Sequence, residues 1–162
     1  TSRRHLYGCP CGYFGDTTRE CRCTGAIIQR YLAKISGPLL DRIDLHIEVP
    51  AVPYTDLRSS AAGVTSAEIR ERVNRARDVQ AKRGFYNAQI PHRHLRELCR
   101  LDDAGERTLE LAVRRMSLSA RAHDRILKVA RTIADIGGSE HVSGKHVAEA
   151  VQYRSLDRNY WQ

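Results

Sequence analysis

The sequence lacks several features that would assign it to common classes of protein. None of its apolar runs approaches the ~18 residues of a membrane-spanning helix. No secretory signal is visible at the N-terminus either, so we expect no membrane partner and a cytoplasmic location. Aromatic residues make up only 6% of the chain, so its core must be mainly aliphatic. No GxxxxGK(S/T) phosphate-binding loop and no apolar strand ending in paired acidic residues occur, so the chain alone cannot hydrolyse Mg-ATP.

Positive charge is abundant in this chain of 162 residues, which is long enough for one domain or two small ones. Lysine and arginine number 27 against 19 aspartate and glutamate, which gives a net charge of +8 and a pI near 9.6. This balance favours an anionic partner such as nucleic acid or nucleotide phosphate. Residues 65–100 are the most basic stretch. They form either a solvated helix face or a surface that meets phosphates.

The cysteines are unevenly distributed. Four of the five form two CxC pairs: Cys9, Cys11, Cys21 and Cys23. In a chain without a secretion signal, such clustering favours a metal over disulfides. Zinc prefers four soft ligands in a tetrahedron, and Gly12 and Gly15 allow the chain to reverse between the pairs. We therefore predict a structural zinc site, with four free thiols or oxidative disulfides as alternatives. Cys99 lies on an apolar helical face and is predicted to belong to the core.

Residues 36–50 contain a turn followed by a pattern typical of a strand. The apolar spacing of residues 24–35 predicts a helix, and Gly37-Pro38 should end it. Apolar residues then alternate with polar ones, which predicts a half-buried strand from Ile43 to Val49 that Pro50 stops. Arg42 lies where the turn enters this strand, between Asp41 and Asp44. On spacing alone, Arg42 could simply pair with either neighbouring carboxylate.

The remainder of the chain has the signals of a helical bundle. Residues 51–64 have no sustained periodicity and are predicted to be a linker. Thr65 and Glu68 form a capping box, and the helix that they begin should run to about Arg83. Further helices are predicted near residues 91–99, 103–116, 119–136 and 143–151, and the one after Ser119 should be central.

Three segments carry a resemblance to a known family. Residues 36–45 resemble the arginine-finger segment of AAA+ ATPases of the magnesium-chelatase and MCM branch. The runs Cys9-Pro10-Cys11-Gly12-Tyr13 and Cys21-Arg22-Cys23 resemble those that ComM-like proteins carry before that segment. Residues 118–135 resemble the sensor 2 helix of this branch. From Cys9 to about Arg154, the chain therefore resembles the C-terminal part of Mg-chelatase-like AAA+ ATPases of the ComM/YifB group.

The resemblance implies a mainly α fold in three parts. Residues 1–50 would be the C-terminal remnant of an α/β AAA+ core, with one short strand and a Cys-rich knuckle. Residues 51–64 would be the linker, and residues 65–162 the helical-bundle lid domain. Tyr7-Gly8 occupies the place where the family carries Asn-Pro, a departure that affects the sensor 1 position.

The resemblance also implies a function. Arg42 would be an arginine finger acting in trans, and Arg121 a sensor 2 residue contacting nucleotide phosphate in cis or in trans. Independently of the resemblance, the helical spacing predicts that Arg131 pairs with Asp135, four residues later, and so braces the lid. ATP and Mg²⁺ would bind in the full-length parent. This parent would be a homo-oligomeric, hexameric ring that remodels DNA by branch migration.

Two other functions are compatible with the sequence. A magnesium-chelatase ATPase subunit, which drives metal insertion into a porphyrin, shares the finger and the lid but is not expected to carry the double CxC run. A non-catalytic zinc and helical module would instead bind nucleic acid directly, with a steep salt dependence.

Overall fold

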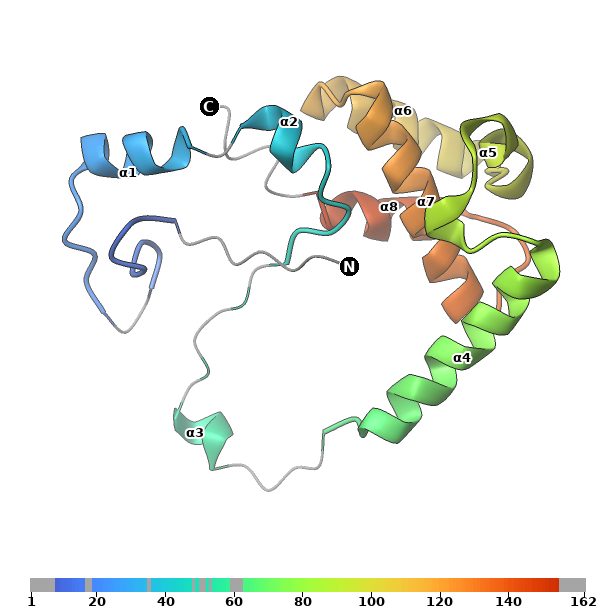
Figure 1. Cartoon of the computed structure of the whole chain (residues 1–162), viewed down its shortest axis with the longest axis horizontal. Coiled ribbons are helices and arrows are strands. Elements are labelled where there is room, and N and C mark those ends of the chain that lie inside the picture. The colour runs from blue at the N-terminus through green and yellow to red at the C-terminus, as the bar shows by residue number, and fades with distance from the viewer. Residues whose placement is uncertain are drawn as a thin grey trace. The chain divides into compact units, whose positions relative to one another are not determined.

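The computed structural model describes residues 8–16, 19–34, 36–47, 49, 52, 54–58 and 63–154. The chain divides into two compact units. Unit 1 comprises Thr1–Leu40 and Ile47–Ala61, and unit 2 comprises Asp41–His46 and Ala62–Gln162. Helices dominate the described residues, as Figure 1 shows, which confirms the mainly α class. None of these helices combines the length and apolarity that a membrane span requires.

Among its described residues, unit 1 has three short helices (Figure 1): α1 (Gly25–Leu32), α2 (Gly37–Leu40) and α3 (Tyr54–Leu57). α1 ends three residues before the predicted limit at residue 35. Gly37 and Pro38 begin α2 instead of serving only as a break. Proline suits a helix start because its ring fixes a helical φ and its missing N–H has no partner there anyway.

The strand predicted from Ile43 to Val49 does not form. Residues 43–47 have no strand structure, and Ile47 and Val49 are 66% and 85% exposed. A strand requires a neighbour to pair with its backbone. Here the Ile43 carbonyl accepts a hydrogen bond from the Arg154 guanidinium, and the His46 N–H donates to the Tyr153 carbonyl at 2.7 Å. Glu48 and Pro50, which belong to the same prediction, lie outside the described residues.

Unit 2 is a helical bundle. Its elements are α4 (Ser66–Arg83), the 3-10 helix η1 (Asn87–Gln89), α5 (His92–Leu98), α6 (Asp103–Met116), α7 (Ala120–Ile136) and α8 (Gly144–Gln152). The capping box is confirmed: Thr65 N–H donates to Glu68 Oε2 at 2.7 Å, and Glu68 N–H donates to Thr65 Oγ1 at 3.3 Å. Gly84 ends α4 with a φ of +87°, a conformation that favours glycine. α7 is central, because α4, α5, η1 and α8 all pack against it.

The core of unit 2 is aliphatic, as the low aromatic content predicted. Its buried members are Ile90, Leu95, Cys99, Leu109, Ile126, Leu127, Ala130, Ala134, Val142, Val147 and Ala150. Cys99 is 2% exposed, as predicted, and burial raises the pKa of its thiol to about 11.

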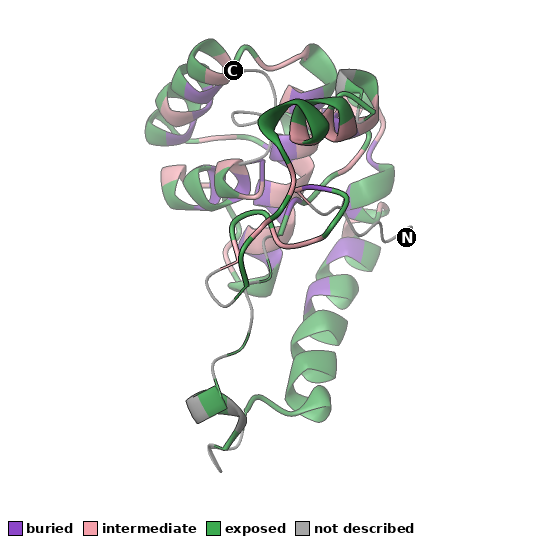
Figure 2. Ribbon diagram, turned by 90° about the vertical axis from the view of Figure 1, so that its left-hand side faces the viewer, coloured by how far each residue is buried: buried purple, intermediate pink, exposed green. Residues whose placement is uncertain are grey.

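The first turns of α4 are largely exposed, as the green lower part of this helix in Figure 2 shows. Ile69 and Val73 are 49% and 43% exposed, and only Ala76 and Gln80 of this helix are buried. The helix α4 therefore contacts the core only through its C-terminal half.

Candidate functional site

The four clustered cysteines converge in unit 1. Cys9 Sγ lies 3.2 Å from Cys11 Sγ and 3.6 Å from Cys21 Sγ, and the sulfurs of Cys11 and Cys21 are 3.6 Å apart. With Cys23 included, all four sulfurs lie within 4.8 Å of one another. A tetrahedral zinc ion with Zn–S bonds of ~2.3 Å requires sulfurs about 3.8 Å apart. The four thiols, none of which forms a disulfide, therefore fit a zinc site.

Two tight turns bring the first CxC pair into this cluster. Gly12 N–H donates to the Cys9 carbonyl and Asp16 N–H to the Tyr13 carbonyl, each at 3.1 Å. Gly12 and Gly15 adopt φ values of +84° and +83°, which side-chain-bearing residues rarely tolerate. The glycines of the sequence motif thus create the chain reversal that a four-cysteine site needs.

Within the cluster, the thiols of Cys9 and Cys21 differ in pKa. Burial opposes ionisation of Cys9, but hydrogen bonds from Cys11, Cys21 and nearby backbone groups outweigh it and lower the Cys9 pKa to about 6. The backbone of Cys23 favours the Cys21 thiolate, but burial and the neighbouring sulfurs raise the pKa of Cys21 to about 12. A divalent cation among the sulfurs would favour thiolates at all four positions.

Arg42 lies in unit 2, in the segment Asp41–His46, which we call the finger segment. Its side chain is exposed. Both flanking carboxylates pair elsewhere: Ser119 Oγ donates to Asp41 Oδ2 at 2.9 Å, and Asp44 forms an ion pair with Arg125. The structure therefore does not show Arg42 paired with either of the neighbouring aspartates.

Arg121 is exposed in the first turn of α7. Ser119, the N-cap of α7, precedes it by two residues and is the residue that binds Asp41. The structure therefore brings together the segments that carry the two arginines, Arg42 and Arg121, within unit 2. The cysteine cluster belongs to unit 1.

The predicted pairing of Arg131 with Asp135 is confirmed, with Arg131 Nε 3.0 Å from Asp135 Oδ1. Arg83 Nη2 also donates to Asp135 Oδ1, at 2.6 Å, and Asn87 Nδ2 donates to Oδ2 at 2.7 Å. Burial opposes ionisation of Asp135, but these hydrogen bonds and the nearby positive charges keep its pKa below the usual range. Sequence reasoning missed Arg83 and Asn87 because they lie 52 and 48 residues from their partner.

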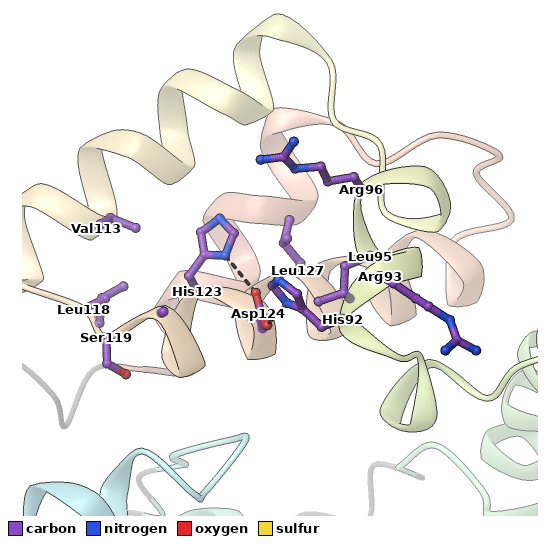
Figure 3. A pocket seen from close by; sticks show the side chains of 11 residues that line it. His92, Arg93, Leu95, Arg96, Val113, Leu118, Ser119, His123, Asp124 and Leu127 are labelled. Carbon is purple, nitrogen blue, oxygen red and sulfur yellow. Dashed lines mark hydrogen bonds and ion pairs between the residues drawn. The ribbon is translucent and has the colours of Figure 1, made fainter.

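A pocket of about 490 Å³ opens between α5, the end of α6 and the start of α7 (Figure 3). Asp124 lines this pocket and contacts two histidines: His92 Nδ1 is 2.7 Å from Asp124 Oδ2, and His123 Nδ1 is 3.1 Å from Oδ1. Burial opposes ionisation of Asp124, but the hydrogen bonds to the two histidines lower its pKa. One ring nitrogen of each histidine is therefore hydrogen-bonded to the Asp124 carboxylate. Sequence spacing gave no signal for this cluster.

Comparison with known proteins covers most of the chain. The family described as magnesium chelatase, subunit ChlI C-terminal, matches residues 63–154, and the family described as magnesium chelatase, subunit ChlI, matches residues 5–57. Competence protein ComM of Haemophilus influenzae is 42% identical over 151 residues, which cover 92% of this chain and 29% of that protein.

Two further relatives are uncharacterized proteins. YifB of Escherichia coli is 42% identical over 139 residues, covering 85% of this chain and 28% of its own length. A protein of Mycobacterium bovis is 36% identical over 151 residues, covering 90% of this chain and 29% of its own. The chain thus spans less than a third of the length of the curated relatives it matches.

Proposed function

Because the chain belongs to the Mg-chelatase-like family of the ComM/YifB group, we propose that it supplies an arginine finger and a sensor 2 residue to an AAA+ ATPase. One observation carries the proposal. Arg42 is an exposed arginine whose two neighbouring carboxylates are both engaged by the helical unit. Its guanidinium is thereby left to a partner outside the finger segment.

The chemistry suits an arginine at this position. Cleavage of a phosphoanhydride spreads negative charge over the γ-phosphoryl oxygens, and a planar guanidinium of permanent charge stabilises it. In comparable nucleotide hydrolases, a finger arginine is worth ~10³–10⁵ in rate. We assign Arg42 to the ATP site of a neighbouring subunit in a hexameric ring. The ATP and Mg²⁺ would be bound by parts of the parent protein outside this chain.

Arg121 is assigned to sense the nucleotide. An exposed arginine in the first turn of a helix can reach a phosphate together with the free N–H groups of that turn. Contact with phosphate in cis or in trans would link the nucleotide state to the position of the bundle. The pairing of Arg131 with Asp135, deep in the same helix, would keep α7 rigid during this movement.

The cysteine cluster is proposed to hold a structural zinc ion through Cys9, Cys11, Cys21 and Cys23. The spacing of the sulfurs supports this proposal. A second observation is the small core of unit 1: α1 has no buried residue, so packing contributes little to holding this helix in place. A bound zinc ion would supply folding free energy that such a unit lacks.

The ring is proposed to act on DNA, as the resemblance to the ComM/YifB group implies. The basic stretch 65–100 supports an anionic partner, and α4 exposes most of its length to solvent. Magnesium-chelatase activity toward a porphyrin is the alternative within the family. The two CxC pairs favour the first function, because chelatase subunits are not expected to carry them.

The deciding experiment is a subunit-mixing assay with the full-length protein. Arg42→Ala subunits and subunits with a defective Walker B site are each expected to lack ATPase activity, whereas a mixture should regain part of it. Such recovery requires that Arg42 completes the ATP site of another subunit. Full activity of Arg42→Ala alone would refute the finger assignment and favour a zinc and helical module that binds nucleic acid without hydrolysing ATP.

A further inference from the structure

We propose that Arg125 and Arg154 are positioning residues that fix Arg42 to helices α7 and α8, so that finger and sensor 2 move together. The inference rests on the proposed function of Arg42. It is argued from the contacts that the finger segment makes inside unit 2, where residues distant in sequence meet the two flanks of Arg42.

The first set of contacts comes from α7. Ser119 Oγ accepts a hydrogen bond from the Ala122 N–H at 3.1 Å and donates to Asp41 Oδ2 at 2.9 Å. One hydroxyl therefore both caps the helix and holds the residue before Arg42. Farther along α7, Arg125 forms an ion pair with Asp44, two residues after Arg42.

The second set comes from Tyr153 and Arg154, the two residues that follow α8. The Arg154 side chain is only 1% exposed, and its guanidinium donates to the carbonyl of Ile43 and lies 3.8 Å from Asp41. The adjacent Tyr153 carbonyl accepts from the His46 N–H at 2.7 Å. Burying a guanidinium is costly unless it is hydrogen-bonded, so Arg154 strongly favours the conformation in which the finger segment lies against it.

These contacts leave Arg42 little freedom at its backbone. The residue before it is held by Ser119, the residue after it by Arg154, and Asp44 by Arg125. A preorganised guanidinium loses less entropy when it meets a developing phosphoryl charge, and catalysis falls steeply with misplacement. Since α7 also carries Arg121, a change in nucleotide state sensed at one ATP site would displace the finger that serves the next.

The Asp44–Arg125 pair offers the cleanest test, because Asp44 is 60% exposed and its replacement should not unfold the bundle. In the full-length ATPase, Asp44→Asn and Arg125→Ala should each lower kcat by up to about 10²-fold. The KM for ATP should remain unchanged, because the finger acts on the transition state and not on nucleotide binding. The charge-swapped double variant Asp44→Arg/Arg125→Asp should recover part of the lost kcat.

A matched control is available on α6. Glu110 and Arg114 form an exposed ion pair at 2.6 Å, and the swap Glu110→Arg/Arg114→Glu changes the same kinds of charge away from the finger segment. This swap should leave kcat unchanged. Arg125→Ala subunits mixed with Walker-B-defective subunits should also regain activity, as Arg42→Ala subunits do. Both substitutions impair the arginine finger that a subunit contributes to its neighbour's ATP site, and neither impairs the subunit's own site.

The two proposals fail separately. If Arg42→Ala abolishes hydrolysis while Asp44→Asn and Arg125→Ala keep the kcat of the unmodified protein, the positioning role is overturned and the finger stands. If single variants lose kcat but the swap recovers none, the ion pair is not the positioning contact. If Arg42→Ala is itself fully active, the proposed function is the part that is wrong.

Discussion

Replacing Asp135 by asparagine should destabilise the helical unit more than any surface substitution on the same helices. The Asp135 side chain is fully buried and carries the negative charge that faces Arg83 and Arg131. Asparagine preserves the shape and the contact with Asn87 but removes that charge. Arg131, with a side chain 3% exposed, would then be a buried cation without a counter-ion.

The loss of stability depends on which hydrogen bonds each arginine can still form when the Asp135 charge is removed. Breaking a buried ion pair by removing one partner costs roughly 3–5 kcal/mol. Arg131 keeps hydrogen bonds to the carbonyls of Ser139 and Glu140, at 2.6 and 2.7 Å, and Arg83 is 17% exposed and can turn toward water. We therefore expect a loss of unfolding free energy at the lower end of this range, about 3 kcal/mol. For a domain of the size of unit 2, this loss lowers Tm by roughly 12–24 °C.

Thermal unfolding of the 162-residue chain, followed by far-ultraviolet circular dichroism, measures this shift directly. Glu110→Gln is the control, because it removes one charge from an exposed pair that contributes little to stability. If Asp135→Asn lowers Tm no more than Glu110→Gln does, the account of Asp135 as the electrostatic centre of the bundle is refuted.

Two further outcomes are expected. Because the pKa of folded Asp135 is below its ordinary value of 3.8, its stabilising effect is complete above that pH and is lost as pH falls below it. The difference in Tm between the unmodified chain and Asp135→Asn should therefore narrow in acid, and a gap that stays constant would contradict this. Cys21→Ser should abolish binding of zinc, measured by metal analysis of the purified chain after dialysis against zinc, whereas Cys99→Ser should retain it. Equal zinc content in both variants would exclude the four-cysteine site.

Local signals in the sequence predicted the local structure well. Thr65 and Glu68 form their capping box because both partners lie within one helical turn. The pairing of Arg131 with Asp135 was predicted for the same reason, since residues four apart on a helix are neighbours. The convergence of the cysteines followed from short spacings and turn-forming glycines.

Features that depend on distant partners were not predictable in this way. Alternation of apolar residues predicted a strand after Arg42, but a strand forms only where another strand accepts its hydrogen bonds, and Arg154 and Tyr153 occupy that role instead. No spacing rule connects Arg154 with Ile43 across 111 residues, or Arg83 with Asp135 across 52. The anchoring of the candidate finger is therefore a property of the tertiary structure.

The pairing of the finger segment with the end of α8 has a consequence for the order of events during synthesis. Ile43 leaves the ribosome long before Arg154, which follows it by 111 residues. At typical elongation rates this interval is on the order of ten seconds. During that time the segment that carries Arg42 lacks its contacts with Tyr153 and Arg154, although Ser119 and Arg125 can already bind it once α7 has been made. The nascent chain therefore completes this part of unit 2 last, when Tyr153 and Arg154 emerge and bind the finger segment.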